Sequence, residues 1–266
     1  MAKTKVKKSR LFDLLLQRGL AKSAEESRGL ILAGRILVNG EKLDKEGAEC
    51  RCDAVVEVLY KCPYVGRGAL KLAAAFGNFQ LNLQGKVCAD VGSSTGGFTE
   101  VLLEQQASKV YSIDTAEGEL AWKLRQDPRV IVMEGVNACY LETLPEPVSF
   151  VSIDISLMPL RSVLPAVKRW LNSNGEVVAL VKPQYEADRK DLPEGAIVND
   201  SALHAHLLAR LIEWVPSIGL YPRDIISSPL PGKGGNREFL LWLQIAERSS
   251  QSLTEKIAAV TGLVLV

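Results

Sequence analysis

Apolar residues follow two different patterns along the chain. Over residues 1–62, short stretches with helical spacing precede short runs with strand spacing. From residue 63 onward, apolar runs of strand length alternate with helix-like stretches. We therefore predict a small domain over 1–62 and a larger domain over 63–246, followed by a C-terminal tail over 247–266.

The first pattern predicts two short helices and a small sheet. Leu11, Leu14 and Leu15 share one face of a helix that Ser9 can cap and Gly19 can end. A second helix is expected between a capping-box pair and a later glycine, and a type I′ hairpin is expected at an Asn-Gly pair. These signals are Ser23 with Glu26, then Gly34, then Asn39 with Gly40. A further strand over 54–59 completes a compact α+β unit.

The second pattern is typical of a doubly wound α/β domain. Strand-length runs separated by helical patterns predict a Rossmann-like fold with a mostly parallel, seven-stranded sheet. The seven runs are Lys86–Val91, Val110–Asp114, Val130–Met133, Val148–Asp154, Glu176–Lys182, Leu220–Ile226 and Phe239–Ile245.

The composition is that of an ordinary globular protein, with 47% hydrophobic and 24% charged residues among 266. No apolar run approaches the roughly 18 residues that a membrane-spanning helix needs, and no signal-peptide core follows the N-terminal charges. A cytoplasmic location is therefore expected.

Five scattered cysteines argue against a disulfide framework. Cys50, Cys52 and Cys62 lack a fourth nearby ligand for a closed zinc site, so we predict no metal.

Charge is distributed unevenly along the chain. Residues 1–71 contain 15 Lys and Arg against 9 Asp and Glu, whereas the remainder contains 17 against 22. The net charge of +1 is therefore the sum of a basic N-terminal part and an acidic remainder. Such an end suits nucleic acid, and a solvated basic tail is the alternative that composition alone leaves open.

A glycine-rich loop follows the first strand of the larger domain. It reads Asp90-Val91-Gly92-Ser93-Ser94-Thr95-Gly96-Gly97-Phe98-Thr99. It lacks the spacing of dinucleotide-binding loops and the Gly-Lys-Ser/Thr ending of a phosphate loop, but its glycines allow a ligand to approach the backbone closely. Asp114 ends the second strand, where a carboxylate can bond both hydroxyls of a ribose. We therefore expect a nucleoside cofactor. S-adenosylmethionine fits this expectation, because it has no pyrophosphate and so needs no phosphate-binding loop.

Two later strand ends carry candidate chemistry. Asp154 ends the fourth strand and Lys182 the fifth, and ligands of open α/β sheets bind outside the carboxyl ends of strands. We expect both side chains to face the cofactor, with a solvated salt bridge as the alternative. A basic, glycine-rich segment over 231–239 could grip the substrate or be an ordinary hairpin connection.

The N-terminal segment resembles the RNA-binding domain named after ribosomal protein S-four. The resemblance rests on the residues at 9–15, 27–31 and 34–40. It implies that Arg10, Arg28 and Arg35 lie on one face and contact phosphates. Such contacts would fix the position of the RNA and add affinity, but they would not select its sequence. The alternative is that these arginines only solubilise a helical face.

From about residue 9 to about residue 245, the chain resembles the TlyA family of rRNA 2′-O-methyltransferases, some of whose members are labelled haemolysin A. The larger domain is similar to FtsJ/RrmJ-type ribose methyltransferases. The segments that carry the resemblance are residues 90–99, 120–130, 181–184 and 235–243. Ala69 stands where a further glycine is usual, residues 115–118 replace a turn richer in glycine and tyrosine, and Cys139 replaces a common arginine. These departures concern substrate contacts.

The resemblance implies a Lys-Asp-Lys-Glu tetrad, which falls on Lys71, Asp154, Lys182 and Glu238. The implied reaction methylates a ribose 2′-hydroxyl, of cytidine in ribosomal RNA, with S-adenosylmethionine as donor. Lys182 would act as general base, oriented by Asp154, while Lys71 and Glu238 position the ribose. Expected cofactor contacts are Asp90, Gly92, Ser93, Ser94, Gly96, Gly97, Phe98, Asp114, Asn137 and Asp154. Expected RNA contacts are Arg10, Arg28, Arg35, Arg67, Lys233 and Arg237.

Two rival functions are weighed against this one. A membrane-active haemolysin-like protein is suggested only by the family label, and the sequence offers no spanning helix for it. A non-catalytic RNA-binding factor for ribosome assembly would need no tetrad, so the four intact residues argue against it. The expected partners are therefore ribosomal RNA or ribosomal subunits, without membrane or metal.

Overall fold

The structure is a computed structural model that describes residues 7–32, 34–45, 47–58, 63–246 and 253–263, without the side chains of residues 194 and 233. It divides into two compact units, Met1–Pro63 and Tyr64–Val266. Each unit has its own hydrophobic core, made in the first by the apolar faces of two helices and in the second by both faces of a large sheet.

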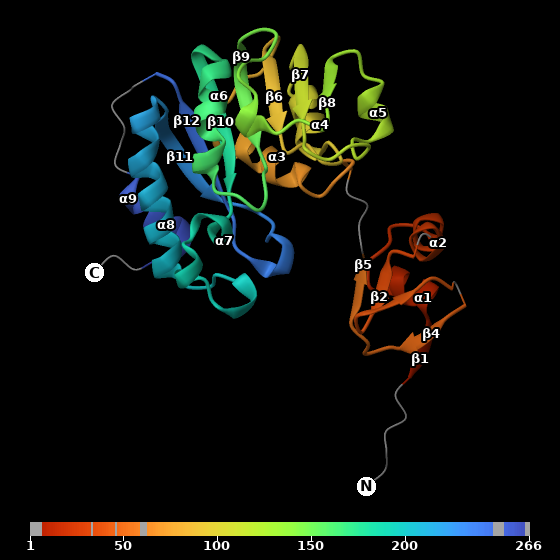
Figure 1. Ribbon diagram of the computed structural model, residues 1–266. Coiled ribbons are helices and arrows are strands. Elements are labelled where there is room, and N and C mark those ends of the chain that lie inside the picture. Colours follow the sequence, from red (N-terminus) through yellow and green to blue (C-terminus); the bar gives the residue numbers. More distant parts are fainter. Residues whose placement is uncertain (1–6, 33, 46, 59–62, 247–252, 264–266) are drawn as a thin grey trace. The chain divides into compact units, whose positions relative to one another are not determined.

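The first unit contains two helices and two small sheets (Figure 1). The leucines at 11, 14 and 15 are buried on one helical face, as their spacing predicted. The strands pair in the order β3-β2-β5 and β1-β4. The elements are β1 (Lys8–Arg10), α1 (Leu11–Gln17), α2 (Ala24–Leu32), β2 (Ile36–Val38), β3 (Glu41–Leu43), β4 (Glu49–Arg51) and β5 (Val56–Val58).

The turn signals of this unit are confirmed, with one exception. Asn39 and Gly40 have φ values of 52° and 81°, the left-handed pair that a type I′ hairpin needs. The Ser23 hydroxyl accepts the N–H of Glu26 at 3.1 Å, as a capping residue does. The predicted cap at Ser9 is wrong. Ser9 lies in β1, opposite Cys50 of β4, and the N-cap position falls on Arg10, before the helix begins at Leu11.

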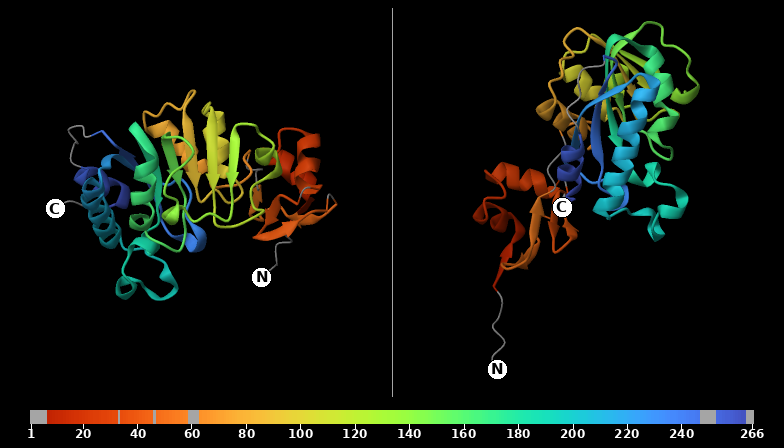
Figure 2. Two further views of the ribbon diagram at one scale, coloured as in Figure 1. Left: turned by 45° about the horizontal axis from the view of Figure 1, so that its top comes forward. Right: turned by 90° about the vertical axis from the view of Figure 1, so that its left-hand side faces the viewer.

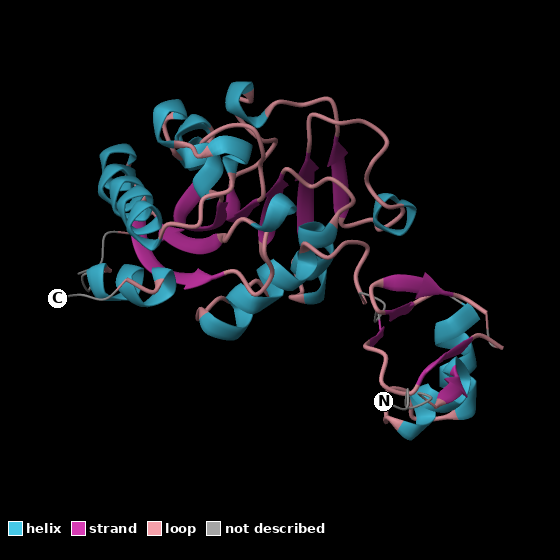
Figure 3. Ribbon diagram, turned by 90° about the horizontal axis from the view of Figure 1, so that it is seen from below, coloured by secondary structure: helices cyan, strands magenta, loops and turns pink. Residues whose placement is uncertain are grey.

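The second unit has the predicted Rossmann-like architecture, with helices on both sides of a seven-stranded sheet (Figures 2 and 3). The strand order is β11-β12-β10-β9-β6-β7-β8, and β12 runs opposite to the other six strands of this sheet. The strands are β6 (Val87–Val91), β7 (Lys109–Ile113), β8 (Val130–Met133), β9 (Val148–Ile153), β10 (Leu171–Val181), β11 (Tyr221–Ser227) and β12 (Phe239–Gln244). The α-helices are α3 (Ala69–Asn78), α4 (Gly97–Glu104), α5 (Trp122–Arg125), α6 (Leu164–Trp170), α7 (Pro183–Glu186), α8 (Ser201–Trp214) and α9 (Thr254–Thr261).

The strand order places a crevice between two strands that are distant in sequence. From β6 the chain proceeds to β7 and β8 on one side, and it then returns to add β9 on the other side of β6. The loops after β6 and β9 therefore diverge at the carboxyl edge of the sheet, where open α/β folds bind ligands. Residues 92–99 follow β6 and Asp154 follows β9, so the topology brings the glycine loop and Asp154 to the same place.

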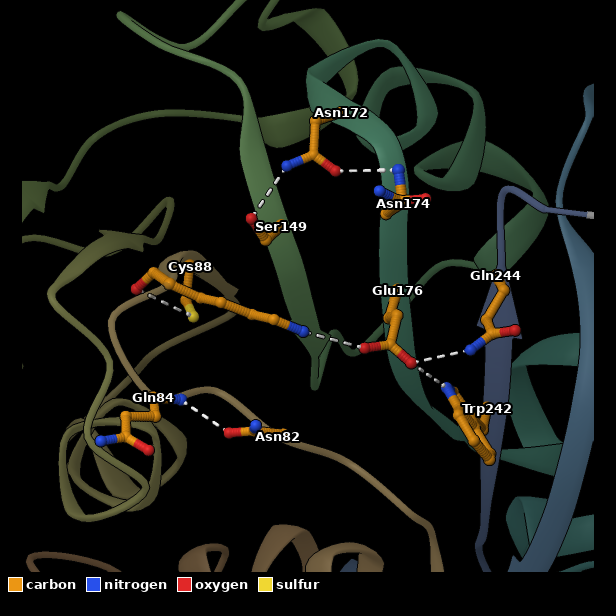
Figure 4. A network of polar contacts seen from close by, with 10 residues as sticks. Asn82, Gln84, Cys88, Ser149, Asn172, Asn174, Glu176, Trp242 and Gln244 are labelled. Atoms are coloured by element: carbon orange, nitrogen blue, oxygen red, sulfur yellow. Dashed lines mark hydrogen bonds and ion pairs between the residues drawn. The ribbon is translucent and has the colours of Figure 1, made fainter.

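The opposite, amino edge of the sheet has a structural polar network (Figure 4). Glu176 on β10 is buried, and it accepts hydrogen bonds from Trp242 Nε1 at 3.2 Å and Gln244 Nε2 at 2.8 Å on β12. Lys86, just before β6, lies 3.3 Å from its other oxygen. Three donors satisfy this buried carboxylate, so it joins three strands without leaving an unpaired charge.

The C-terminal segment contains a packed helix in its described part. Helix α9 packs against α8 and β11, with Ile257 and Ala258 buried. The hydroxyls of Ser201 and Ser227 donate to the carbonyls of Thr261 and Val260 at the end of this helix. Among the described residues, no helix is both long enough and apolar enough to span a bilayer.

Candidate functional site

Two cavities open at the carboxyl edge of the large sheet. The large cavity, of about 610 Å³, lies between the 66–71 turn, the glycine loop and the 230–232 segment. The small cavity, of about 300 Å³, lies between the ends of β7 and β9 and residues 136–139. Both are lined by Gly92, Ser94 and Asp154, so they meet at the crevice between β6 and β9.

The glycine loop packs closely, backbone to backbone, against the end of β9 at the point where the two cavities meet. Gly92 has a φ of +81°, and a Cβ at this position would lie 2.4 Å from the carbonyl oxygen of Asp154. The Asp154 N–H donates to the carbonyl of Val91 at 2.9 Å. Only glycine allows both the left-handed backbone and this approach. The loop thus exposes backbone, rather than side chains, to the place where the cavities join.

The structure brings most of the predicted cofactor residues to these cavities. Eight of the ten line one cavity or both: Gly92, Ser93, Ser94, Gly97, Phe98, Asp114, Asn137 and Asp154. Gly96 does not, because it turns the chain with a φ of +94° and packs against Leu120 and Leu124. Asp90 is the other exception.

Asp90, the first residue of the glycine loop, lines neither cavity. Its carboxylate is fully buried and accepts hydrogen bonds from the Thr99 hydroxyl at 2.7 Å and the Ser152 hydroxyl at 2.9 Å. It thereby ties the start of α4 to β9. Burial raises the pKa of Asp90 to about 7, although both hydroxyls favour its charged form. The structure thus gives Asp90 a role in supporting the loop, and its expected direct contact with the cofactor stays a prediction.

This raised pKa predicts a pH-dependent stability that Asp90→Asn should remove. Below about pH 4 the carboxyl is protonated in both the folded and the unfolded protein. Between about pH 4 and about pH 7 the unfolded chain loses the proton while the folded one retains it, so rising pH favours unfolding. Relative to the variant, the wild type should lose up to about 3 kcal/mol of unfolding free energy between pH 5 and pH 8.

Urea unfolding at pH 5, 6, 7 and 8 measures this difference. Subtracting the two profiles cancels the other titrating groups, which both proteins share. Parallel profiles for wild type and variant would contradict the assignment.

The tetrad forms two ion pairs beside the large cavity. Lys71 Nζ lies 2.5 Å from Glu238 Oε2, and Lys182 Nζ lies 2.7 Å from Asp154 Oδ1. Lys71 and Asp154 line the cavity, while Lys182 and Glu238 are buried beside them. The pairs come from four elements: the first turn of α3, the ends of β9 and β10, and the residue before β12.

Local structure fixes the direction of Lys182. Pro183 ends β10 and begins α7, so the lysine leaves the sheet at its carboxyl edge. Its Nζ also donates to the Ser156 hydroxyl at 2.9 Å. Two oxygens from the loop after β9 therefore hold this amine, and such an amine can accept a proton when it is neutral or stabilise negative charge when it is protonated.

Two supporting residues were not anticipated from the sequence. Ser156 could have been suspected from its position two residues after Asp154. Glu186 accepts the N–H of Leu160 at 2.7 Å and so joins the loop after β10 to the loop after β9. Burial raises the pKa of Glu186. Its sequence context, a polar turn, contains no signal for this burial.

The three predicted RNA-contacting residues of this unit differ in their surroundings. Arg67 is exposed and lines the large cavity. Arg237 instead donates to the carbonyls of Val260 and Thr261 at 2.7 and 3.0 Å, which caps α9. The guanidinium thus supports the C-terminal helix, and the expected contact of Arg237 with RNA stays a prediction. The Lys233 side chain lies outside the described residues.

The 231–239 segment belongs to the connection of the β11–β12 hairpin, and its residues Pro231 and Gly232 line the large cavity together with the preceding Leu230. In the first unit, Arg10 and Arg28 are exposed and Arg35 is half-buried, with Arg28 over the ring of Phe12. Their common RNA-binding face stays a prediction.

Within the described part of the chain, no group of His, Cys, Asp or Glu side chains is arranged to hold a metal, and Cys62 lies outside it.

Comparison with known families separates the same two parts of the chain. Residues 64–245 match the model of the FtsJ-like methyltransferase family, and residues 9–54 match the S4 domain. The first match covers the large sheet and all four tetrad residues.

Two curated relatives and one solved structure are similar to this chain over most of its length. The chain is 40% identical to "Putative rRNA methyltransferase YqxC" of Bacillus subtilis, over 89% of this chain and 86% of the relative. It is 36% identical to "16S/23S rRNA (cytidine-2'-O)-methyltransferase TlyA" of Mycobacterium tuberculosis, over 90% of each. A solved structure, "Putative hemolysin from Streptococcus thermophilus", superposes with a TM-score of 0.75 at 36% identity, over 97% of this chain and 96% of that one.

Proposed function

We propose that this chain, which belongs to the FtsJ-like methyltransferase family, methylates a ribose 2′-hydroxyl of cytidine in ribosomal RNA with S-adenosylmethionine as donor. The observation that carries the proposal is the pair of ion pairs Lys71–Glu238 and Lys182–Asp154 beside the large cavity. The target and the position of methylation are those printed for the TlyA relative, and they come to this chain by similarity.

The small cavity fits the nucleoside part of the donor. Asp114 lies at the end of β7 and is held by the N–H groups of Ser94 at 2.7 Å and Ala116 at 2.9 Å. These bonds fix its carboxylate at the cavity wall, where oxygens with remaining lone pairs can accept from ribose hydroxyls. Asn137 lines the same cavity, and Gly92 lets the ligand approach the backbone. When bound, the donor supplies an activated methyl group on a sulfonium sulfur.

The tetrad residues would orient and deprotonate the RNA hydroxyl. A ribose in the large cavity would meet Lys71 and Asp154, which both line it. We assign Lys182 as general base because it is buried beside Asp154 and its amine is held by two oxygens. The nitrogen that would accept the proton therefore has a fixed direction. The Lys71–Glu238 pair would position the ribose. Alignment of the two reactants then accounts for much of the rate enhancement.

The first unit would supply affinity for RNA. The S4 match covers its helices and β2–β3 hairpin, and the basic excess of the chain lies here. Arg10 and Arg28 are exposed, and phosphates are the groups that such cations bind in nucleic acids. A membrane-active or a non-catalytic function is not favoured, because neither would need the four tetrad side chains joined around a cavity.

Methyl transfer from labelled S-adenosylmethionine to purified ribosomal subunits tests the proposal. We expect label in ribosomal RNA, resistant to alkaline cleavage at one cytidine because a 2′-O-methyl group blocks attack by that oxygen. Subunits from cells that already contain the modification serve as the matched control and should take up little label. Label in a base or in protein would contradict the proposal, as would its absence with every ribosomal substrate.

A further inference from the structure

The small cavity contains a carboxylate that the proposed reaction does not use. Glu119, on the segment that follows β7, lines this cavity and is exposed. The hydroxyl of Ser94 donates to Glu119 Oε2 at 3.0 Å, and the N–H of the same residue donates to Asp114 Oδ2 at 2.7 Å. Two carboxylates are thus held by one residue of the glycine loop, against the same cavity.

The three carboxylates of the small cavity differ in how their charge is compensated. Asp154 faces the ammonium of Lys182, and Asp114 accepts two backbone N–H groups. Glu119 has a neutral hydroxyl as its partner. No Lys or Arg occurs among the described residues that line this cavity. The charge of Glu119 is therefore the least compensated and the most available to a ligand.

The donor and its product differ in one charge. S-adenosylmethionine has a sulfonium cation, whereas S-adenosylhomocysteine has a neutral thioether on the same nucleoside and amino-acid groups. A hydrogen bond to the ribose would stabilise both ligands alike. A carboxylate also attracts the ammonium that both ligands share, but only the donor has the additional sulfonium cation, and the attraction between charges acts over several ångströms.

We propose that Glu119 is a further cofactor-binding residue, whose charge makes the cavity prefer the cationic donor to its neutral product. The inference rests on the proposed use of S-adenosylmethionine at this site. It names a specificity role for a residue outside the tetrad, and it explains how product could leave a cavity whose shape fits both ligands.

Calorimetric titration of the full chain with each ligand separately tests this inference. In Glu119→Gln the side chain keeps its shape and loses its charge. We expect the ratio of the Kd for S-adenosylhomocysteine to the Kd for S-adenosylmethionine to fall about two- to fivefold, the range of an exposed charge interaction. In the wild type, the same ratio should decrease toward 1 in 0.5 M salt, because an exposed charge is screened.

The matched control is Glu104→Gln at the end of α4, an equal change of charge at an exposed residue that does not line either cavity. It should leave the ratio unchanged. An equal weakening of both ligands in Glu119→Gln would overturn the inference, as would an unchanged ratio. If the wild type bound neither ligand, the proposed function would fail, and this inference with it.

Discussion

Lys182→Met is expected to lower kcat for RNA methylation by about 10²- to 10⁴-fold at saturating donor and RNA, the range for loss of a general base. Methionine keeps an unbranched apolar stem of similar length, so the packing around β10 should persist. The variant removes the amine that contacts Asp154 and Ser156 at 2.7 and 2.9 Å. Single-turnover assays with calorimetric donor titration separate this chemical loss from binding, and donor Kd should change by less than about threefold.

Two further variants distinguish the role of Lys182 from its charge. Lys182→Arg retains a cation but cannot lose its proton near neutral pH, so it should be about as inactive as the methionine variant. Lys86→Met removes another lysine–carboxylate pair, at the amino edge of the sheet, and should retain kcat. Wild-type turnover in Lys182→Met would disprove the base assignment, and substantial activity in Lys182→Arg would indicate an electrostatic role instead.

Replacing Arg10, Arg28 and Arg35 together by glutamine should weaken RNA binding by on the order of 10²-fold at 0.1 M salt. Each phosphate contact contributes to affinity by releasing counterions, so the slope of log K against log salt should become shallower by about 2 to 3. Donor affinity should stay the same, because both cavities are lined entirely by residues of the second unit. Fluorescence anisotropy with ribosomal RNA fragments over 0.05–0.3 M salt measures the slope.

Arg51→Gln provides the control within the same unit. Arg51 is also exposed, but its guanidinium is paired with Asp53 at 2.8 Å, so its removal should change the slope by less than about one unit. A triple variant with wild-type affinity and slope would show that the three arginines only solubilise the unit.

Local signals in the sequence were sufficient for most elements. The hairpin at Asn39-Gly40 was predictable because the left-handed backbone of both residues is a property of the dipeptide itself. The seven strands of the large sheet were predictable because buried parallel strands need continuous apolar runs. The failure at Ser9 has the same origin: a helix cap is a local signal, and here pairing with residues 49–51, distant in sequence, prevails.

Side-chain roles were less predictable than elements. Arg237 belongs to a basic, glycine-rich segment, yet it caps a helix whose residues lie 23 and 24 positions later. Asp90 is the first residue of the glycine loop, yet it lines neither cavity, and its carboxylate accepts hydrogen bonds from Thr99 and Ser152. In both cases the residue type was noted correctly, but its partner depends on how distant segments pack.

The sequence by itself determined the fold class, the glycine loop and the residue types of the candidate site, since periodicity and turn chemistry act over a few residues. Which of these residues meet was decided by tertiary structure. Lys71 and Glu238 are 167 positions apart and pair at 2.5 Å. Their pairing depends on the strand order, which inserts β12 beside β10 and brings the residue before β12 to the carboxyl edge of the sheet. Strand order is set by the burial of whole apolar faces, and no short segment encodes it.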